Sequence, residues 1–143
     1  KAAVVLADET AAGDRALLNL GHTIARGVER IGNYDGRIVH GEAVALGLCV
    51  AHRFSVYLGL CPPDDAERVS AHVAAVGLPT RFKDIPIHVA APALEAAMAQ
   101  DKKVKDGVIR FVLSRGIGKA VVSEGLPPEV IRAFLVSEGL NAP

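Results

Sequence analysis

The sequence lacks the charge imbalance and the cysteine content that mark several large classes of protein. It carries 16 basic and 16 acidic residues and only 2 cysteines. Balanced charge gives no electropositive footprint, so we expect neither a nucleic acid nor a membrane surface as a partner. So few cysteines suit a reducing compartment. Cys49 lies in an apolar run, and we expect it to be a buried, inert thiol.

Long hydrophobic runs and targeting signals are also missing. The longest apolar stretch, 43–50, is far shorter than the roughly 20 residues that cross a bilayer. No segment reads as a signal peptide, and we therefore expect a cytoplasmic protein. The chain starts at Lys1 and enters an apolar run at once, so we expect a fragment or an isolated domain without its N-terminal partner. Its 143 residues, half of them apolar, correspond to one domain, 1–143.

Hydrophobic spacing predicts mainly helices. A first helix is expected over 15–30 with Asp14 as its cap, followed by turn chemistry over 32–36. A second helix is expected over 41–58. It is apolar on nearly all sides, which indicates a central, buried helix. Further helices are expected from an Asp64 or Asp65 cap to Val76, over 93–103 and over 129–137.

The pattern changes from helix to strand late in the chain. Residues 108–113 and 119–122 are rich in β-branched side chains around a glycine-containing turn, which predicts a two-stranded hairpin. Strands and helices do not alternate as they do in a nucleotide-binding sheet. Gly116 and Gly118 lie in the hairpin without a following helix, so they are not a dinucleotide fingerprint. The fold class is therefore mainly α, a helical domain with one small two-stranded hairpin.

Four polar residues form a stripe on the first predicted helix. Arg15, Asn19, His22 and Arg26 fall within an arc of about 60°, at about 100° per residue. A solvated helix face is the simpler interpretation. However, the stripe contains no lysine or glutamate, and it gathers groups that bind oxyanions and metals.

His40 precedes the buried helix and could share a metal ion with His22. Two histidines leave a zinc site one short of the three protein ligands that are usual in catalytic sites. A third ligand must come from elsewhere. Glu42 is near in the sequence, but the missing N-terminal half is the better candidate. The other histidines, His52, His72 and His88, have no comparable context and are interpreted as ordinary helix or loop residues.

Several segments along the chain form a joint pattern in their order and spacing. They are 1–5 with 8–9, 18–23, 40–47, 101–104, 109–113 and 116–118. Each segment alone is modest, but the joint pattern is specific and covers nearly the whole chain. Together these segments resemble 3-dehydroquinate synthase.

The resemblance implies the C-terminal, helical half of a metal- and NAD-dependent enzyme. That family converts 3-deoxy-D-arabino-heptulosonate 7-phosphate to 3-dehydroquinate and phosphate in the shikimate pathway. The implied cofactors are zinc or cobalt and NAD, with NAD bound mainly by an N-terminal domain that this chain lacks. The implied partners are a phosphorylated sugar acid, that N-terminal domain and, at full length, a second copy in a homodimer. The chain alone is then expected to be inactive.

The resemblance also assigns roles to residues. His22 and His40 match the two histidine metal ligands of the family. Lys1, Arg15 and Asn19 match active-site residues that contact the substrate. A lysine of the pair Lys102 and Lys103 matches a substrate-binding lysine, and Lys102 is favoured, although the register between the two stays open. A solvated helix end is the simpler interpretation of that pair.

Two positions depart from the family pattern. Arg26 stands where the family usually has a second histidine, and Ala11 stands where it usually has a glutamate. An arginine cannot relay a proton near neutral pH, because it stays protonated, but it could bind phosphate. The sequence therefore leaves two alternatives open. One is a related sugar-phosphate cyclase that acts on another ring precursor, and the other is a non-catalytic helical domain derived from the enzyme.

Overall fold

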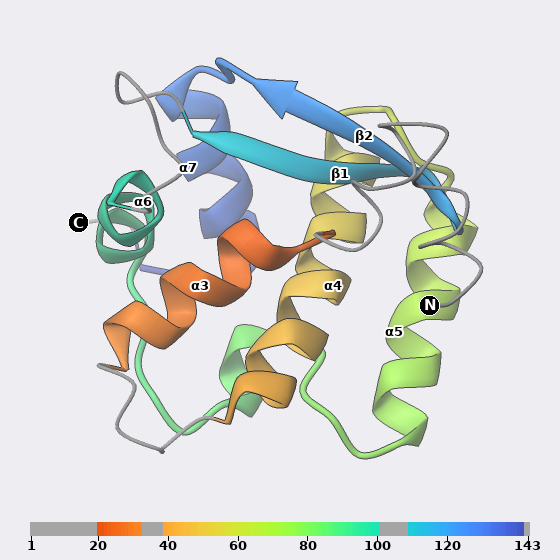
Figure 1. The fold of residues 1–143 in the computed structure, drawn as a ribbon, viewed down its shortest axis with the longest axis horizontal. Coiled ribbons are helices and arrows are strands. Elements are labelled where there is room, and N and C mark those ends of the chain that lie inside the picture. Colours follow the sequence, from red (N-terminus) through yellow and green to blue (C-terminus); the bar gives the residue numbers. More distant parts are fainter. Residues whose placement is uncertain (1–19, 33–38, 101–108, 142–143) are drawn as a thin grey trace, which may run out of the picture.

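The computed structural model describes residues 20–32, 39–100 and 109–141. Within these ranges it contains five α-helices, one 3₁₀ turn and one antiparallel hairpin (Figure 1), which confirms the predicted fold class. No helix in the described ranges is long and apolar enough to cross a bilayer. The elements in chain order are α3 (His22–Ile31), α4 (His40–Tyr57), α5 (Pro63–Ala75), η1 (Phe82–Asp84), α6 (Ala91–Ala99), β1 (Arg110–Gly116), β2 (Lys119–Glu124) and α7 (Pro128–Ser137).

Helix α4 lies at the centre of the fold. It packs against α3, α5 and β1, with the hairpin lying across one end of the helices (Figure 1). Its side chains are buried on most sides, as the apolar sequence predicted, and Cys49 is fully buried with an unbonded thiol. Burial raises the pKa of the Cys49 thiol, which keeps it protonated and inert. The helix ends before Gly59, whose φ of 78° suits glycine.

Aromatic and hydroxyl side chains join α4 to the hairpin and to α7. The Phe54 ring stacks on Phe134 with centroids 4.4 Å apart and meets the edge of Phe111 at 5.2 Å. The Ser55 hydroxyl accepts the Ser114 backbone N–H at 2.8 Å and donates to the Ala51 carbonyl at 2.7 Å. Aromatic pairs of this kind add about 0.5–1.5 kcal/mol beyond their burial. The central helix is therefore anchored by two other elements, β1 and α7.

A largely buried ion pair also fixes the later part of α4. The Arg53 guanidinium donates to both carboxylate oxygens of Glu138, with an Nη2–Oε1 distance of 2.7 Å, and to the Thr80 carbonyl at 2.7 Å. The two side chains are only 15% and 7% exposed. Removing one partner of such a pair leaves an unpaired buried charge, which costs about 3–5 kcal/mol. The contact ties the end of α7 and the chain after α5 to the central helix.

Helices α3 and α4 touch at two glycines. A Cβ atom placed on Gly21 would lie 2.5 Å from the Gly47 carbonyl carbon, and one placed on Gly47 would collide with the Gly21 carbonyl oxygen. Gly21 also has a φ of 80°, the left-handed region that favours glycine. Only glycine at both positions lets the start of α3 contact the backbone of α4 directly.

Some predicted boundaries were wrong. Helix α5 begins at Pro63 after Pro62, so Asp64 and Asp65 lie in its first turn and neither is the N-cap. Proline suits the first helical position because it has no N–H to leave unpaired. Helix α6 begins at Ala91, two residues before its predicted start, and has Pro92 in its first turn, where proline is also tolerated. It ends at Ala99. The first predicted helix, over 15–30, is also wrong at its start. Helix α3 begins at His22, because Gly21 has a φ of 80°, outside the helical region, so no continuous helix runs through it. The predicted Asp14 cap lies outside the described residues.

The glycine contact gives a testable prediction for stability. Gly47→Ala should lower the free energy of unfolding by about 1–3 kcal/mol, because the added methyl group forces the α3 and α4 backbones apart. Gly41→Ala, in the same helix, is the matched control, since its Cβ would have no neighbour within 4 Å. The control should be neutral or stabilising by up to about 1 kcal/mol, from helix propensity alone. Urea unfolding measures both, and equal midpoints for the two variants would contradict a close contact at Gly47.

Candidate functional site

The polar stripe of the first helix is partly described. His22 and Arg26 lie four residues apart on the first two turns of α3, and both are half-buried. Each takes part in an interaction beyond those the described residues show. The opposite face of α3 is apolar, with Ile24 and Val28 buried in the core. The other predicted site residues, Lys1, Arg15, Asn19, Lys102 and Lys103, lie outside the described residues.

His40 is the first residue of α4 and stands at the molecular surface. Its side chain is 70% exposed. Directly before it, the Val39 backbone N–H donates to Glu42 Oε1 at 3.0 Å, which caps the helix. In the described ranges no three histidine, cysteine, aspartate or glutamate side chains gather to hold a metal ion. Among the described residues, Glu42 therefore does not form such a group with the two histidines.

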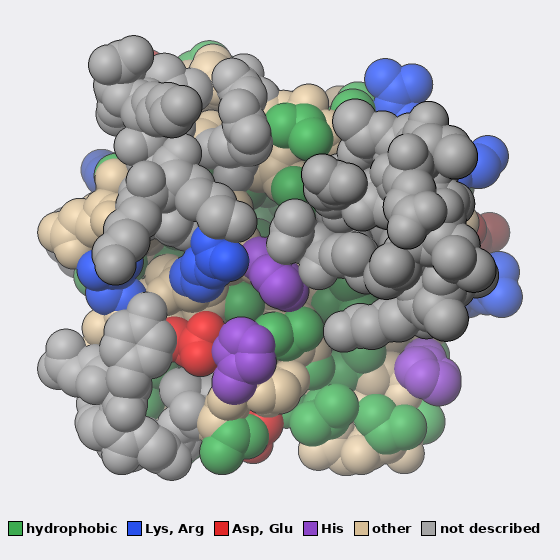
Figure 2. Space-filling view, viewed as in Figure 1, with side chains coloured by type: hydrophobic (Ala, Val, Ile, Leu, Met, Phe, Trp, Pro, Cys, Tyr) green, Lys and Arg blue, Asp and Glu red, His purple; other side chains and the backbone are tan. Residues whose placement is uncertain are grey.

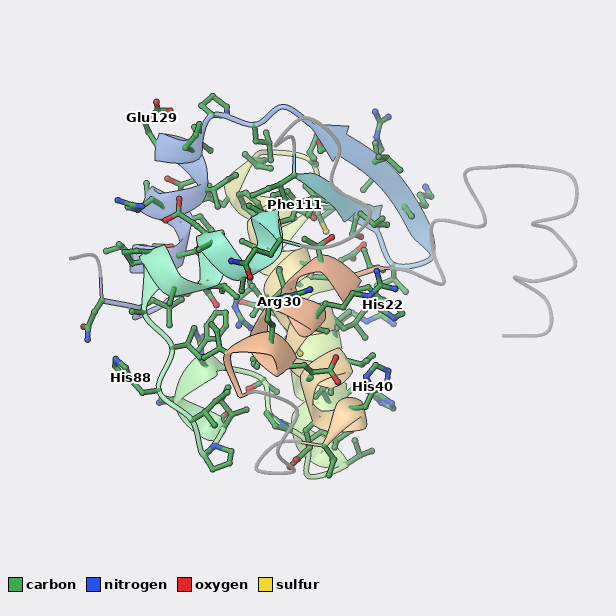
Figure 3. The ribbon with its side chains drawn as sticks, turned by 60° about the vertical axis from the view of Figure 1, so that its left-hand side comes forward. His22, Arg30, His40, His88, Phe111 and Glu129 are labelled. Atoms are coloured by element: carbon green, nitrogen blue, oxygen red, sulfur yellow. The ribbon has the colours of Figure 1, made fainter. Side chains whose placement is uncertain are left out.

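The packing of α3 on α4 brings His22 and His40 to one side of the molecule. His22 follows Gly21, which touches Gly47, and His40 lies seven residues before Gly47 on the same face of α4, about 10 Å along the helix axis. Figure 3 shows both imidazoles projecting on the same side of the ribbon. In the space-filling view, two histidine side chains lie together on the face that carries α3, next to one basic and one acidic group (Figure 2).

An acidic residue outside the predicted set lies beside His40. Glu29, on the third turn of α3, places Oε2 3.0 Å from Nδ1 of His40. The residue is only 9% exposed. A signal was present in the sequence, because Glu29 continues the 4, 3, 4 spacing of the polar stripe by three more residues. It stays within about 80° of the stripe's other members. The structure thus adds one carboxylate to the predicted set.

The remaining histidines lie outside this cluster. His52 is buried within α4, and its Nδ1 is 2.8 Å from the Leu48 carbonyl of the same helix. Burial lowers the pKa of His52, so it stays neutral near pH 7. His72 is exposed on α5, and His88 is exposed on the side of the ribbon far from His22 and His40 (Figure 3). All three agree with their interpretation as ordinary histidines.

The two histidines on this face are of a residue type that can bind a divalent metal. Imidazole nitrogen is a ligand that suits zinc, copper, iron and nickel in proteins. His22 and His40 come from two helices whose relative position is fixed by direct backbone contact, so their side chains start from a rigid base. A pair of imidazoles offered from rigid helices, with one position left to another part of the protein, is compatible with a zinc site of three protein ligands.

Comparison with known proteins gives consistent matches. The family model described as 3-dehydroquinate synthase C-terminal matches residues 1–104. The chain is 52% identical over 139 residues to 3-dehydroquinate synthase of Brucella anthropi, covering 94% of this chain and 36% of that protein. It is 53% identical over 137 residues to that of Agrobacterium fabrum, with the same coverage. The chain therefore spans about a third of the length of these relatives.

Solved structures agree on the fold. The 2-epi-5-epi-valiolone synthase of Streptomyces hygroscopicus, with NAD+ and Zn2+ bound, superposes with a TM-score of 0.69 at 26% identity, covering 86% of this chain and 32% of that one. A 2-deoxy-scyllo-inosose synthase complex gives 0.66 at 22% identity, with 85% and 34% covered, and supports the fold alone. Since the family model covers most of its length, the chain belongs to the 3-dehydroquinate synthase C-terminal family.

Proposed function

We propose that this chain is the helical, metal-binding part of a 3-dehydroquinate synthase in the shikimate pathway. Joined to an NAD-binding half, it takes part in converting 3-deoxy-D-arabino-heptulosonate 7-phosphate to 3-dehydroquinate and phosphate. The observation that carries the proposal is a sequence identity of 52–53% to proteins named 3-dehydroquinate synthase, over 94% of this chain. A full-length homodimer and a cytoplasmic location belong to the same proposal.

The proposed cofactors are NAD and a divalent metal, zinc or cobalt. The related valiolone synthase, at 26% identity, has NAD+ and Zn2+ bound. When bound, NAD would supply a temporary hydride acceptor and the metal a Lewis acid for the substrate hydroxyl. His22 and His40 would hold the metal. The third ligand and most of the NAD contacts would come from the other half of the protein.

The basic residues would bind the two anionic ends of the substrate. Arg26 follows His22 by one helical turn, so it is proposed to hold the phosphate next to the metal site. Lys1, Arg15, Asn19 and one of the Lys102–Lys103 pair keep the substrate-binding roles that the sequence suggests. Holding both ends would orient the ring relative to the metal, which is the main contribution expected from such contacts.

Two alternatives remain distinct from this proposal. A related sugar-phosphate cyclase would share the fold, as the valiolone synthase does, but that protein is only 26% identical to this chain. A non-catalytic helical domain would keep the fold without turnover, and Arg26 and Ala11 are the residues that favour it. The higher sequence identity to the 3-dehydroquinate synthases favours the proposed function over both alternatives.

The metal role of His22 can be tested in the protein that joins this chain to its NAD-binding half. His22→Ala should lower zinc or cobalt affinity by more than about 100-fold, beyond the loss that follows removal of an outer-shell partner. Phosphate release from the heptulosonate phosphate should fall to background. His72→Ala, an exposed histidine on α5, is the control and should keep both properties. Metal content after gel filtration and a phosphate assay give the two readouts.

The outcomes of this experiment separate the alternatives. Full metal content and activity in His22→Ala would remove His22 from the site. A parent protein that binds metal and NAD but releases phosphate only from another sugar phosphate would be a related cyclase. A parent protein that releases phosphate from none of them would be the non-catalytic domain.

A second prediction concerns Arg26. If it holds the substrate phosphate, Arg26→Ala should raise KM by about 10-fold or more with a smaller change in kcat, because a charge-assisted bidentate contact is lost. Arg26→His should preserve or raise kcat, because it introduces a group that can exchange a proton. Steady-state kinetics on the joined protein measure both effects.

Arg30 offers the matched control for Arg26. It lies one helical turn beyond Arg26 and about 80° around α3 from His22, and in Figure 3 its side chain leaves α3 on a different side from that of His22. Arg30→Ala should therefore leave KM unchanged. Kinetics identical to the parent for both Arg26 variants would show that Arg26 lies on the helix surface without a role in catalysis.

A further inference from the structure

We infer that Glu29 is a positioning residue for His40: its buried carboxylate holds the imidazole with hydrogen on Nδ1 and thereby leaves Nε2 as the ligating nitrogen. The consequence for metal binding rests on the proposed function. The tautomer itself does not, because it is a property of the metal-free protein.

The contact joins a buried group to an exposed one. Oε2 of Glu29 lies 3.0 Å from Nδ1 of His40, a hydrogen-bond distance. The Glu29 side chain is 11% exposed, whereas the His40 side chain is 70% exposed. Within the described ranges His40 is the one hydrogen-bond or ion-pair partner of this carboxylate. A carboxylate removed from water is costly unless it is paired, so the packing of α3 on α4 favours keeping this bond.

The chemistry of the two groups sets the direction of the bond. An ionised carboxylate has no hydrogen and can only accept. In a neutral imidazole one nitrogen is a donor and the other an acceptor, so Nδ1 must carry the hydrogen when it faces Glu29. Nε2 then presents its lone pair on the exposed side of the ring. An unrestrained neutral histidine in water favours the opposite tautomer, and Glu29 would therefore reverse the intrinsic preference.

This arrangement is the one that metal-binding histidines use. A ligating imidazole commonly donates its second ring N–H to a carboxylate, which fixes the tautomer and raises the basicity of the ligating nitrogen. The neighbouring carboxylate, Glu42, makes a different contact, because its Oε1 accepts the Val39 backbone N–H. Glu29 and Glu42 thus provide two glutamates near one histidine with different tasks, which makes them a matched pair for mutation.

The test measures the His40 tautomer in metal-free protein joined to its NAD-binding half. Nitrogen chemical shifts of ¹⁵N-labelled histidine separate a protonated from an unprotonated ring nitrogen. The spectra are recorded at about pH 8.5, roughly two units above the ordinary histidine pKa. The parent protein and His40→Gln identify the His40 signals. In the parent we expect a protonated Nδ1 and an unprotonated Nε2.

The variants then separate positioning from folding. An amide at residue 29 can donate as well as accept, so Glu29→Gln should shift the His40 population toward hydrogen on Nε2 while keeping the size of the side chain. It should also weaken zinc affinity about 10- to 100-fold. Glu42→Gln should change neither the tautomer nor the affinity beyond about 3-fold, because a glutamine oxygen can still accept the Val39 backbone N–H.

Two results would overturn the inference. One is a parent spectrum with hydrogen on Nε2, or on both nitrogens. The other is a Glu29→Gln spectrum identical to that of the parent. Neither result depends on whether the protein binds metal or turns over. A protein that shows the expected tautomer but binds no zinc would instead contradict the proposed function and leave the role of Glu29 in the free protein intact. Because the parent spectrum alone can decide, a variant that fails to fold does not remove the test.

Discussion

The direct contact between Gly21 and Gly47 is the constraint on which the candidate site depends. Two helices that touch through backbone atoms leave little room to slide or rotate, because every displacement meets main chain rather than a flexible side chain. His22 directly follows Gly21 in the chain, and His40 lies on the same helix face as Gly47. The contact therefore fixes where both imidazoles begin. Glycines at a helix crossing bury no side chain and so contribute little apolar burial to stability. Here they occur where α3 and α4, the helices that carry the two proposed metal ligands, touch.

The rest of the fold keeps α4 in place while its first turn stays exposed. The aromatic cluster around Phe54 and the ion pair between Arg53 and Glu138 lie in the later part of the helix. His40 stands at the opposite end, where its side chain is mostly exposed. A buried helix that presents its first residue to solvent combines a rigid base with an accessible ligand. Functional groups placed on rigid elements hold their geometry better than groups on loops.

The sequence predicted the central helix and the hairpin because both have strong local signals. An all-round apolar run that glycine terminates has few alternatives to a buried helix, and two β-branched runs around a turn have few alternatives to a hairpin. The α5 cap was predicted wrongly because Asp64 and Asp65 are good caps by residue type, whereas Pro63 occupies the first helical position. Two valid local rules competed there, and proline geometry decided the outcome.

Glu29 shows why part of a site cannot be predicted from spacing. A glutamate on a helix is ordinarily a solvent-facing residue, and the place of Glu29 on the polar stripe does not by itself show that it is buried. Its contact with His40 comes from the packing of α3 on α4, which is a property of the tertiary structure. The stripe spacing could have placed Glu29 beside His22 and Arg26, but not beside His40. Only the crossing of the two helices brings a carboxylate of one to a histidine of the other.

A metal site divided between two parts of a protein has a consequence for its energetics. Two imidazoles alone hold a divalent ion weakly, so under the proposed function most of the binding free energy appears only when the third ligand arrives. The same free energy then favours docking of the two parts, because a ligand that binds only the joined state stabilises that state. A histidine already held in its ligating tautomer lowers the cost of that step, since no proton has to move between ring nitrogens. The Glu29–His40 contact would thus contribute to assembly of the site as well as to its geometry.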